Sequence, residues 1–210
     1  MNSRAFSGLA WAYTYCIVVW VFIGFNFFIS PGNNVLLHLN PAVFGNIFIA
    51  YCIYRLRGED KNFKTAFLLS CVSIVFHLFF LLDDQPYNHL VVVYWKAYLV
   101  IYISIDCLML WIVCGGIDSL ANKLNQTNLP EKALYRRKFY VLAHGLFGVY
   151  VVLITYGLSF IKFKNPNDYI LLLPFVFIFF TMVLAIYISY VFIINLFRQA
   201  ARELITQTDQ

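Results

Sequence analysis

The sequence predicts an all-α protein, a polytopic transmembrane bundle of about six helices with both termini in the cytoplasm. The 210 residues are 62% apolar and 12% charged, with a mean hydropathy of +0.75, whereas an average soluble domain is about 25% charged. Apolar runs of about 20 residues, long enough to cross about 30 Å of hydrocarbon, recur along the chain. Basic residues gather in alternate loops, as they do on the cytoplasmic side of membrane proteins. These features exclude a soluble enzyme, a disordered chain and a nucleic-acid binder.

Six apolar runs are the expected spans, and they form a single domain over residues 1–210. In chain order they cover residues 8–29, 35–54, 65–82, 90–113, 139–161 and 169–197. Each is expected to be a helix, because a backbone in hydrocarbon must satisfy its own hydrogen bonds and the runs lack the alternation of a membrane barrel. Asn40 and Pro41 interrupt the second run, and Pro174 predicts a kink near the start of the sixth.

The distribution of Lys and Arg sets the predicted orientation. With the N-terminus in the cytoplasm, 12 of the 15 basic residues fall on the inner side. These are Arg4, Arg55, Arg57, Lys61, Lys64, Lys123, Lys132, Arg136, Arg137, Lys138, Arg198 and Arg202. Lys162 and Lys164 remain outside, and Lys96 lies within a span. We therefore expect a multi-pass protein of the plasma (inner) membrane.

Two further features bear on this topology. Asn125, Gln126 and Thr127 form a glycosylation acceptor pattern, which the orientation puts on the inner side, where no sugar is attached. The five cysteines lie within spans or at their inner ends and form no Cys-x-x-Cys pair. We expect them to be free, buried and apolar in character.

Asp106 and His144 are the candidate intramembrane polar pair. A charged group in a span costs about 2.5–3.5 kcal/mol at mid-bilayer, so each one is a candidate for function. Position along the helices puts both in the inner leaflet, roughly 10 Å and roughly 8 Å deep. They can act as a proton-accepting carboxylate–imidazole pair, because histidine titrates near neutral pH, or form a buried hydrogen bond that fixes helix packing. The structural interpretation is favoured and the functional one stays open.

A second polar cluster is expected at the outer end of the bundle. Its members are His77, Asp83, Asp84, His89 and Lys96. Lys96 can extend its ammonium toward the surface and pair with Asp83 or Asp84, which is favoured over a divalent-metal site because the spacing matches no ligand motif. His77 and His144 lie in opposite leaflets, about 15 Å apart along the membrane normal, so they cannot ligate one haem. Haem ligation by His77 with His38 or His89 stays open, although both partners are expected at or beyond the helix ends. No cofactor, metal ligand or catalytic residue is expected.

The longest charged segments outside the spans favour a docking role at the cytoplasmic face. One lies between the fourth and fifth spans and the other is the C-terminal tail, and both are expected to extend helices with charged faces. The candidate docking residues are Arg136, Arg137, Lys138, Arg198 and Arg202. The predicted function is that of a non-enzymatic membrane subunit that senses or anchors. Its expected partners are the lipid bilayer, further copies of itself and a soluble protein, with no nucleic acid.

Two alternatives to this function remain open. One is a small channel or proton-coupled transporter that uses Asp106 and His144, and the other is a haem-binding or other intramembrane enzyme. Transporters usually contain broken helices at mid-membrane, and only the prolines of the second and sixth runs hint at such breaks. Ala143, Gly145 and Gly148 in the fifth run would let another helix approach closely, within the bundle or between subunits.

Overall fold

The computed structural model of the protein describes residues 3–29, 41–82, 89–160 and 173–206. In these residues the chain forms six helices and no strand. The helices are α1 (Ser3–Ile29), α2 (Pro41–Leu56), α3 (Lys61–Leu82), α4 (His89–Lys123), α5 (Asn128–Phe160) and α6 (Leu173–Thr206). The predicted all-α class is therefore confirmed.

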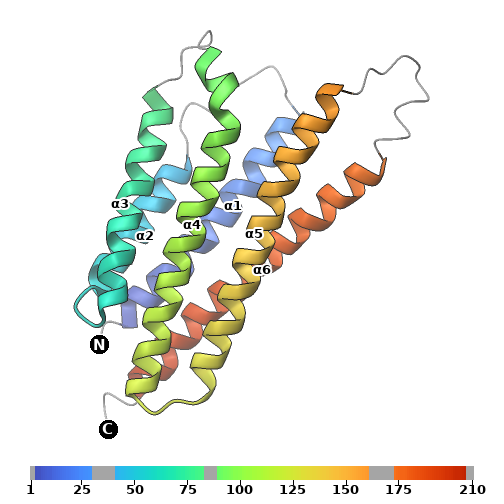
Figure 1. The fold of residues 1–210 in the computed structure, drawn as a ribbon. Helices are drawn as coiled ribbons and strands as arrows, with labels where there is room; N and C mark the ends of the chain where they lie inside the picture. The colour runs from blue at the N-terminus through green and yellow to red at the C-terminus, as the bar shows by residue number, and fades with distance from the viewer. Residues whose placement is uncertain (1–2, 30–40, 83–88, 161–172, 207–210) are drawn as a thin grey trace.

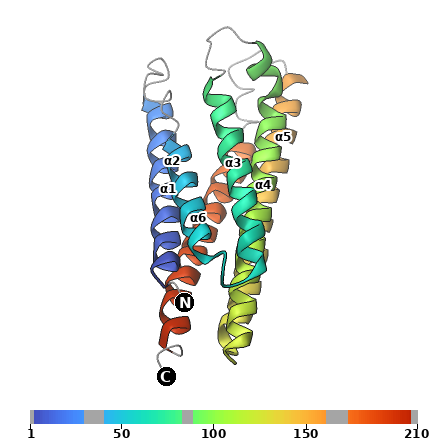
Figure 2. The ribbon, with the colours of Figure 1, turned by 90° about the vertical axis from the view of Figure 1, so that its left-hand side faces the viewer.

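The helices run up and down in alternation, so that Ser3 and Thr206 lie at the same end of the molecule (Figure 1). We call this end the terminal end. Each helix packs against the next one along the chain, and α6 also packs against α1. A view from the side shows α1 and α2 on one side and α3, α4 and α5 on the other (Figure 2). The bundle is therefore closed on itself, and side chains from helices far apart in the sequence meet inside it.

The helix boundaries refine the predicted spans. Helix α5 begins at Asn128 instead of residue 139 and α6 continues past residue 197 to Thr206, which confirms the two predicted helix extensions. Helix α4 also continues past residue 113 to Lys123, an extension that was not predicted. Helix α2 begins at Pro41, and the first part of the predicted second span, residues 35–40, lies outside the described residues. Pro174 lies in the first turn of α6, where its missing N–H interrupts no helical hydrogen bond, so the expected kink has no cause there.

Within the described residues, three helices are long and apolar enough to cross a membrane. The qualifying segments are Val100–Lys123 of α4, Asn128–Ile154 of α5 and Leu173–Leu204 of α6. Their 24, 27 and 32 residues correspond to about 36–48 Å, more than the about 30 Å of bilayer hydrocarbon. The described part of α2 holds a shorter apolar stretch, Val43–Leu56. Length and composition thus indicate a membrane protein.

Apolar side chains cover much of the outer surface of α6. The large apolar residues exposed there are Leu173, Phe175, Val176, Phe177, Ile178, Phe180, Val183, Leu184, Tyr187 and Ile188. Soluble monomers rarely expose apolar surface on this scale. A surface of this kind suits lipid, because hydrocarbon imposes no penalty on an exposed Phe or Leu.

The buried core lies toward the terminal end and is rich in aromatic rings. Phe6 of α1 packs edge-to-face on Phe63 of α3, with ring centroids 6.0 Å apart. Tyr13 of α1 packs on Phe197 of α6 at 5.4 Å. These four side chains are nearly or fully inaccessible to solvent, and they join α1 to helices on both sides of it.

Helices α1 and α2 pack through two reciprocal contacts between a glycine and a cysteine. A Cβ on Gly8 would lie 2.6 Å from Sγ of Cys52, and a Cβ on Gly45 would lie 2.5 Å from Sγ of Cys16. Because the two helices are antiparallel, each one presents its glycine to the cysteine of the other. The absent side chains let the helices approach closely, as small residues do in membrane bundles. The five cysteines are free, and three of them are buried.

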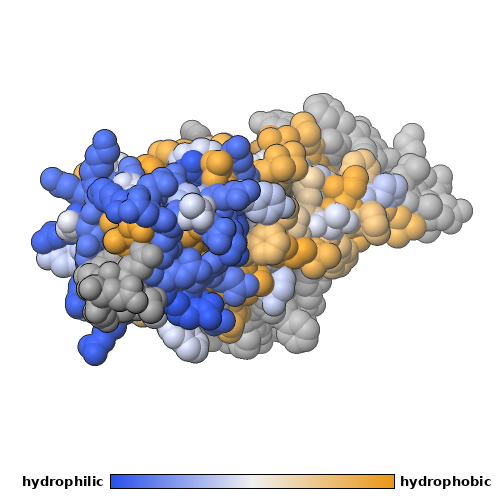
Figure 3. Space-filling view, turned by 90° about the horizontal axis from the view of Figure 1, so that it is seen from below, coloured by the Kyte–Doolittle hydropathy of each residue, from blue (hydrophilic) through white to orange (hydrophobic). Residues whose placement is uncertain are grey.

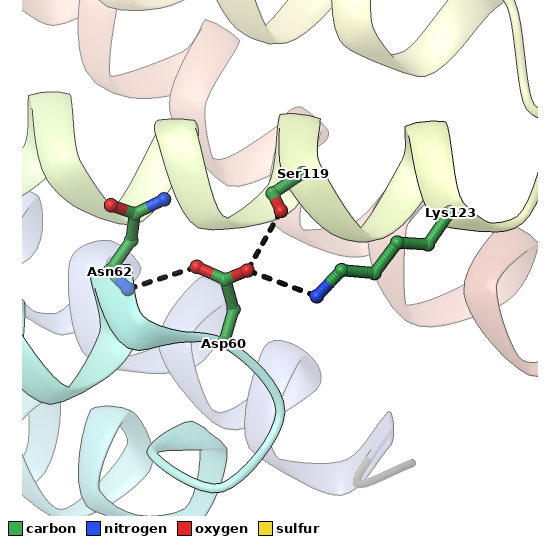
Figure 4. A network of polar contacts seen from close by, with 4 residues as sticks. All are labelled: Asp60, Asn62, Ser119 and Lys123. Atoms are coloured by element: carbon green, nitrogen blue, oxygen red, sulfur yellow. Dashed lines mark hydrogen bonds and ion pairs between the residues drawn. The ribbon is translucent and has the colours of Figure 1, made fainter.

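Asp60 fastens the turn between α2 and α3 to the end of α4 (Figure 4). Its Oδ1 accepts a hydrogen bond from the backbone N–H of Asn62 at 2.9 Å, which caps the start of α3. Its Oδ2 accepts from Ser119 Oγ at 2.7 Å and pairs with Lys123 Nζ at 3.2 Å. Burial raises the pKa of Asp60, but these hydrogen bonds and the Lys123 charge outweigh burial and lower the pKa below its ordinary value of 3.8.

The turn between α4 and α5 closes α4 with a Schellman motif. Gln126 N–H donates to the carbonyl of Ala121 at 2.9 Å, and Asn125 N–H donates to that of Asn122 at 3.1 Å. Asn125 has a φ of 53°, a left-handed conformation that asparagine tolerates better than most residues. The side-chain amide of Gln126 also donates to the carbonyl of Glu203 at 2.9 Å, which ties this turn to α6.

Candidate functional site

A buried polar cluster lies where α4, α5, α1 and α6 meet. Asp106 comes from α4, Tyr140 and His144 come from α5, Tyr13 from α1 and Tyr190 from α6. Tyr140 and His144 are four residues apart and so project from one face of α5. Asp106 is 8% exposed and His144 7%, so both polar side chains lie inside the protein. The hydroxyl of Tyr140 donates a hydrogen bond to Oδ2 of Asp106.

The imidazole of His144 is held in one orientation. Its Nδ1 lies 3.0 Å from the carbonyl oxygen of Tyr140, and because a carbonyl only accepts, Nδ1 must carry the hydrogen. The ring stacks on that of Tyr140 with centroids 3.9 Å apart and an interplanar angle of 23°. Nε2 is buried and has no hydrogen-bond partner among the described residues. In the neutral ring this nitrogen presents a lone pair to the interior.

Two further tyrosines surround the pair. Tyr190 packs edge-on against Tyr140 at 5.4 Å and against His144 at 5.3 Å. Tyr13 lies 6.0 Å from Tyr190, and its hydroxyl is buried without a hydrogen-bond partner in the described part of the chain. Buried polar atoms are usually paired, so Tyr13 and His144 each leave one polar group available inside the bundle.

A small cavity of about 10 Å³ adjoins this cluster. Its walls are formed by Tyr13, Cys16, Asn46, Ile49, Tyr102, Asp106 and Tyr190. This volume is close to the least that holds one water molecule, and a buried water typically makes about three hydrogen bonds. The walls supply a carboxylate, an amide and phenol groups, which suit a water molecule or a proton more than a larger ligand.

The predicted pair of Asp106 and His144 therefore meets in one cluster, but through an intermediary. Tyr140 stands between them, bonded to the carboxylate and stacked on the imidazole. Sequence reasoning missed Tyr140, Tyr13 and Tyr190, because 15 tyrosines are spread along the chain and the sequence does not show which of them meet inside the bundle. The spacing of Tyr140 and His144, one helical turn apart, was the available signal.

A basic groove opens at the terminal end between α1, α5 and α6, with a volume of about 1000 Å³. Each helix contributes arginine to its lining: Arg4 from α1, Arg136 from α5, and Arg198 and Arg202 from α6. Arg198 and Arg202 are four residues apart and share a face of α6. Seen from below, hydrophilic side chains gather on the left of the view, and apolar ones prevail among the coloured residues toward the right (Figure 3).

Within the described residues, three of the four arginines of the groove have no charged partner. None of the described residues that line it is acidic. Arg4, Arg136 and Arg198 form no ion pair within the described part of the chain, and Nη1 of Arg136 has no hydrogen-bond partner there. Trp11 lies at its edge and is 65% exposed.

The predicted docking residues divide between the groove and its surroundings. Arg136, Arg198 and Arg202 line the groove. The guanidinium of Arg137 instead lies over the ring of Trp111 at 4.5 Å, and Lys138 is exposed elsewhere on α5. Arg4 and Trp11 were not among the predicted docking residues, because their proximity to α5 and α6 depends on how the helices pack.

The predicted outer polar cluster falls outside what the structure describes. Asp83 and Asp84 lie outside the described residues, and so do the side chains of His77, His89 and Lys96. Among the described residues, no group of three or more His, Cys, Asp or Glu side chains could hold a metal ion.

No protein-family model, no curated protein and no solved structure matches this chain. Function is therefore inferred from the chemistry of the buried cluster and of the basic groove alone.

Proposed function

We propose that the protein is a multi-pass subunit of the plasma (inner) membrane whose six helices all cross the bilayer, with both termini in the cytoplasm. The three helices that are long and apolar enough to span support this proposal. The alternating direction of the helices also supports it, because an even number of passes brings both termini to one side. The arginines at the terminal end suit the cytoplasmic side by the positive-inside rule.

At its cytoplasmic end this subunit docks a soluble partner and anchors it to the membrane, without catalysing a reaction. The observation that carries this proposal is the basic groove, in which arginines of three helices converge and carboxylates are absent from the described lining. Guanidinium groups form paired hydrogen bonds to carboxylates and phosphates, so the partner presents an acidic surface. Anchoring requires no chemistry at mid-membrane.

The proposal includes self-association through the outer face of α5. Gly145 is exposed, and a Cβ built on it would meet no atom of the described residues within 4 Å. Leu142, Leu146 and Val149 flank it and are also exposed. A second helix could approach closely at such a glycine. Cross-linking in native membranes tests this, since Gly145→Leu should reduce the dimer band if α5 forms the contact.

Recovery of a partner from native membranes tests docking. Arg136, Arg137 and Lys138 are three adjacent docking residues of α5, and Arg136 lines the groove. Replacing all three with Glu should abolish recovery of the soluble partner on an affinity-tagged chain. The control variant reverses two charges outside the groove, at Lys61 and Lys64, which are exposed and do not line it. Equal recovery from the two variants would count against docking at this site.

A second candidate function, a proton-coupled carrier or small channel, is favoured by the buried cluster. Asp106 and His144 lie inside the protein with an unpartnered ring nitrogen and a water-sized cavity nearby. Carriers place ionisable groups at such positions. If this candidate is right, Asp106→Asn should abolish proton flux into proteoliposomes and leave partner recovery intact. The docking proposal expects Asp106→Asn to have little effect on activity.

A further inference from the structure

We infer that the basic groove between α1, α5 and α6 is a binding site for a phosphate group, with Arg4, Arg136, Arg198 and Arg202 as its ligands. This inference rests on the proposed function in one respect, the placement of the terminal end at the inner leaflet. The docking proposal says only that the partner presents an acidic surface. The present inference names phosphate as the group that the groove recognises.

The arrangement of the arginines supports a compact anion. Four guanidinium groups from three helices line one groove, so a single ligand can contact groups that come from distant parts of the sequence. Arginine presents several N–H donors in a planar fork that matches the oxygens of phosphate. Several convergent forks suit a tetrahedral phosphate, whose oxygens point in different directions, better than a single planar carboxylate.

Three of the four groove arginines lack a counter-charge among the described residues. Arg4, Arg136 and Arg198 have no ion pair among the described residues, although like charges that converge on one groove repel each other. Glu203, one turn along α6 from the groove residue Gln199, accepts a hydrogen bond from that residue at 2.6 Å and does not line the groove. A bound anion would supply the missing negative charge.

The shape and position of the groove fit a phosphate carried on a larger molecule. Its volume of about 1000 Å³ is at the upper end of the range of small-molecule sites, about 300–1,000 Å³. Trp11 is exposed beside the arginines, and tryptophan is enriched at the headgroup level of membranes. The phosphate can therefore belong to the headgroup of an anionic lipid or to a soluble phosphorylated compound.

Native mass spectrometry of the full chain in detergent tests the inference with three probes. Phosphatidylglycerol represents an anionic headgroup, phosphatidylcholine is the neutral counterpart, and inorganic pyrophosphate represents a soluble phosphate. The groove variant is Arg136→Gln with Arg198→Gln. The matched control, Lys61→Gln with Lys64→Gln, removes the same charge from exposed positions outside the groove.

The groove variant should raise the Kd for the bound phosphate by about tenfold or more, since each lost contact is a charge-assisted hydrogen bond. The control should change the Kd by about twofold or less, as expected of screened surface charges. A third variant, Arg136→Lys with Arg198→Lys, keeps the charge, and its Kd should lie between those of the groove variant and the control. Helical circular dichroism of each variant shows that it is folded.

Each outcome decides a specific point. Groove-dependent binding of phosphatidylglycerol assigns the site to a lipid headgroup, and groove-dependent binding of pyrophosphate assigns it to a soluble phosphate. Equal weakening by groove and control variants, or no binding of any probe by the unmodified chain, overturns the inference. Partner recovery is not part of this assay, so a chain that binds phosphate but recovers no partner rejects the docking proposal and keeps the phosphate site.

Discussion

The hydroxyl of Tyr140 on α5 donates a hydrogen bond to the carboxylate of Asp106 on α4. This contact is buried among aromatic rings of α1, α5 and α6. It satisfies part of the hydrogen-bonding capacity of a carboxylate that would be costly to bury alone. The same tyrosine stacks on His144, so one side chain organises the whole buried cluster.

Tyr140→Phe should therefore destabilise the bundle. It removes the donor from a buried carboxylate and leaves the ring in place, which typically costs about 1–3 kcal/mol in free energy of unfolding. Denaturant unfolding of the purified chain, followed by circular dichroism, measures this change. Tyr135→Phe is the matched control, because Tyr135 lies on the same helix and is 62% exposed. Equal stability of the two variants would contradict the structural role given to Tyr140.

Asp60 should be the most important polar residue of the α2–α3 turn. Asp60→Ala removes the cap of α3 and both contacts to α4, and a lost cap alone costs about 0.5–2 kcal/mol. Asp60→Asn keeps a side-chain oxygen for the cap but removes the charge that pairs with Lys123, so it should cost less. Thermal unfolding in detergent measures both. The opposite ranking would show that capping contributes little here.

The same residue gives stability a pH dependence. The pKa of Asp60 is lower in the folded protein than its ordinary value of 3.8, so the folded state favours the ionised form. Its contribution is fully present above that ordinary value and is lost as the pH falls through the lower, folded pKa. The melting temperature of Asp60→Asn should therefore approach that of the unmodified chain below about pH 4. If the melting temperatures of the two proteins differed by the same amount from pH 7 down to pH 3, ionised Asp60 would not be the source of the pH dependence.

The reciprocal glycine–cysteine contacts predict a rescue. Gly45→Ala puts a Cβ 2.5 Å from Sγ of Cys16, and overpacking of this kind costs about 1–3 kcal/mol. Cys16→Ala removes that sulfur, so the double variant should recover much of the loss. Gly145→Ala serves as control, because the new Cβ meets no atom within 4 Å. It should be neutral or stabilising, since Ala has the higher helix propensity. Unfolding in detergent measures the stability of each variant. If the losses from Gly45→Ala and Cys16→Ala simply add in the double variant, the contact is refuted.

The glycosylation acceptor at Asn125 tests the topology. Asn125 is exposed but lies at the terminal end, which we propose is cytoplasmic, so expression in a eukaryotic cell should leave it unmodified. Tyr169→Thr completes a second acceptor at Asn167, on the proposed outer side, and this variant should gain a sugar. Glycosidase treatment and gel mobility report both. A sugar at Asn125 would invert the proposed orientation.

Part of the fold was predictable because it follows from composition and local pattern. The all-α class, the helix at each apolar run and the helical extensions of α5 and α6 are consequences of hydrophobicity and backbone hydrogen bonding. Asp106 and His144 were also identified, because ionisable residues in apolar runs are few. The start of α2 was less predictable, since Pro41 permits either a helix start or a break within a helix.

The sequence by itself determined that this chain forms apolar helices with most of its basic residues in alternate loops, because these properties depend on residue type and spacing along the chain. Only the tertiary structure decided that Tyr140 lies between Asp106 and His144, and that Arg4 shares a groove with Arg136 and Arg198. Such neighbours are set by which helices pack together and by their rotation about their own axes. Close packing of Gly8, Gly45 and the aromatic core fixes that rotation, and no local pattern specifies it.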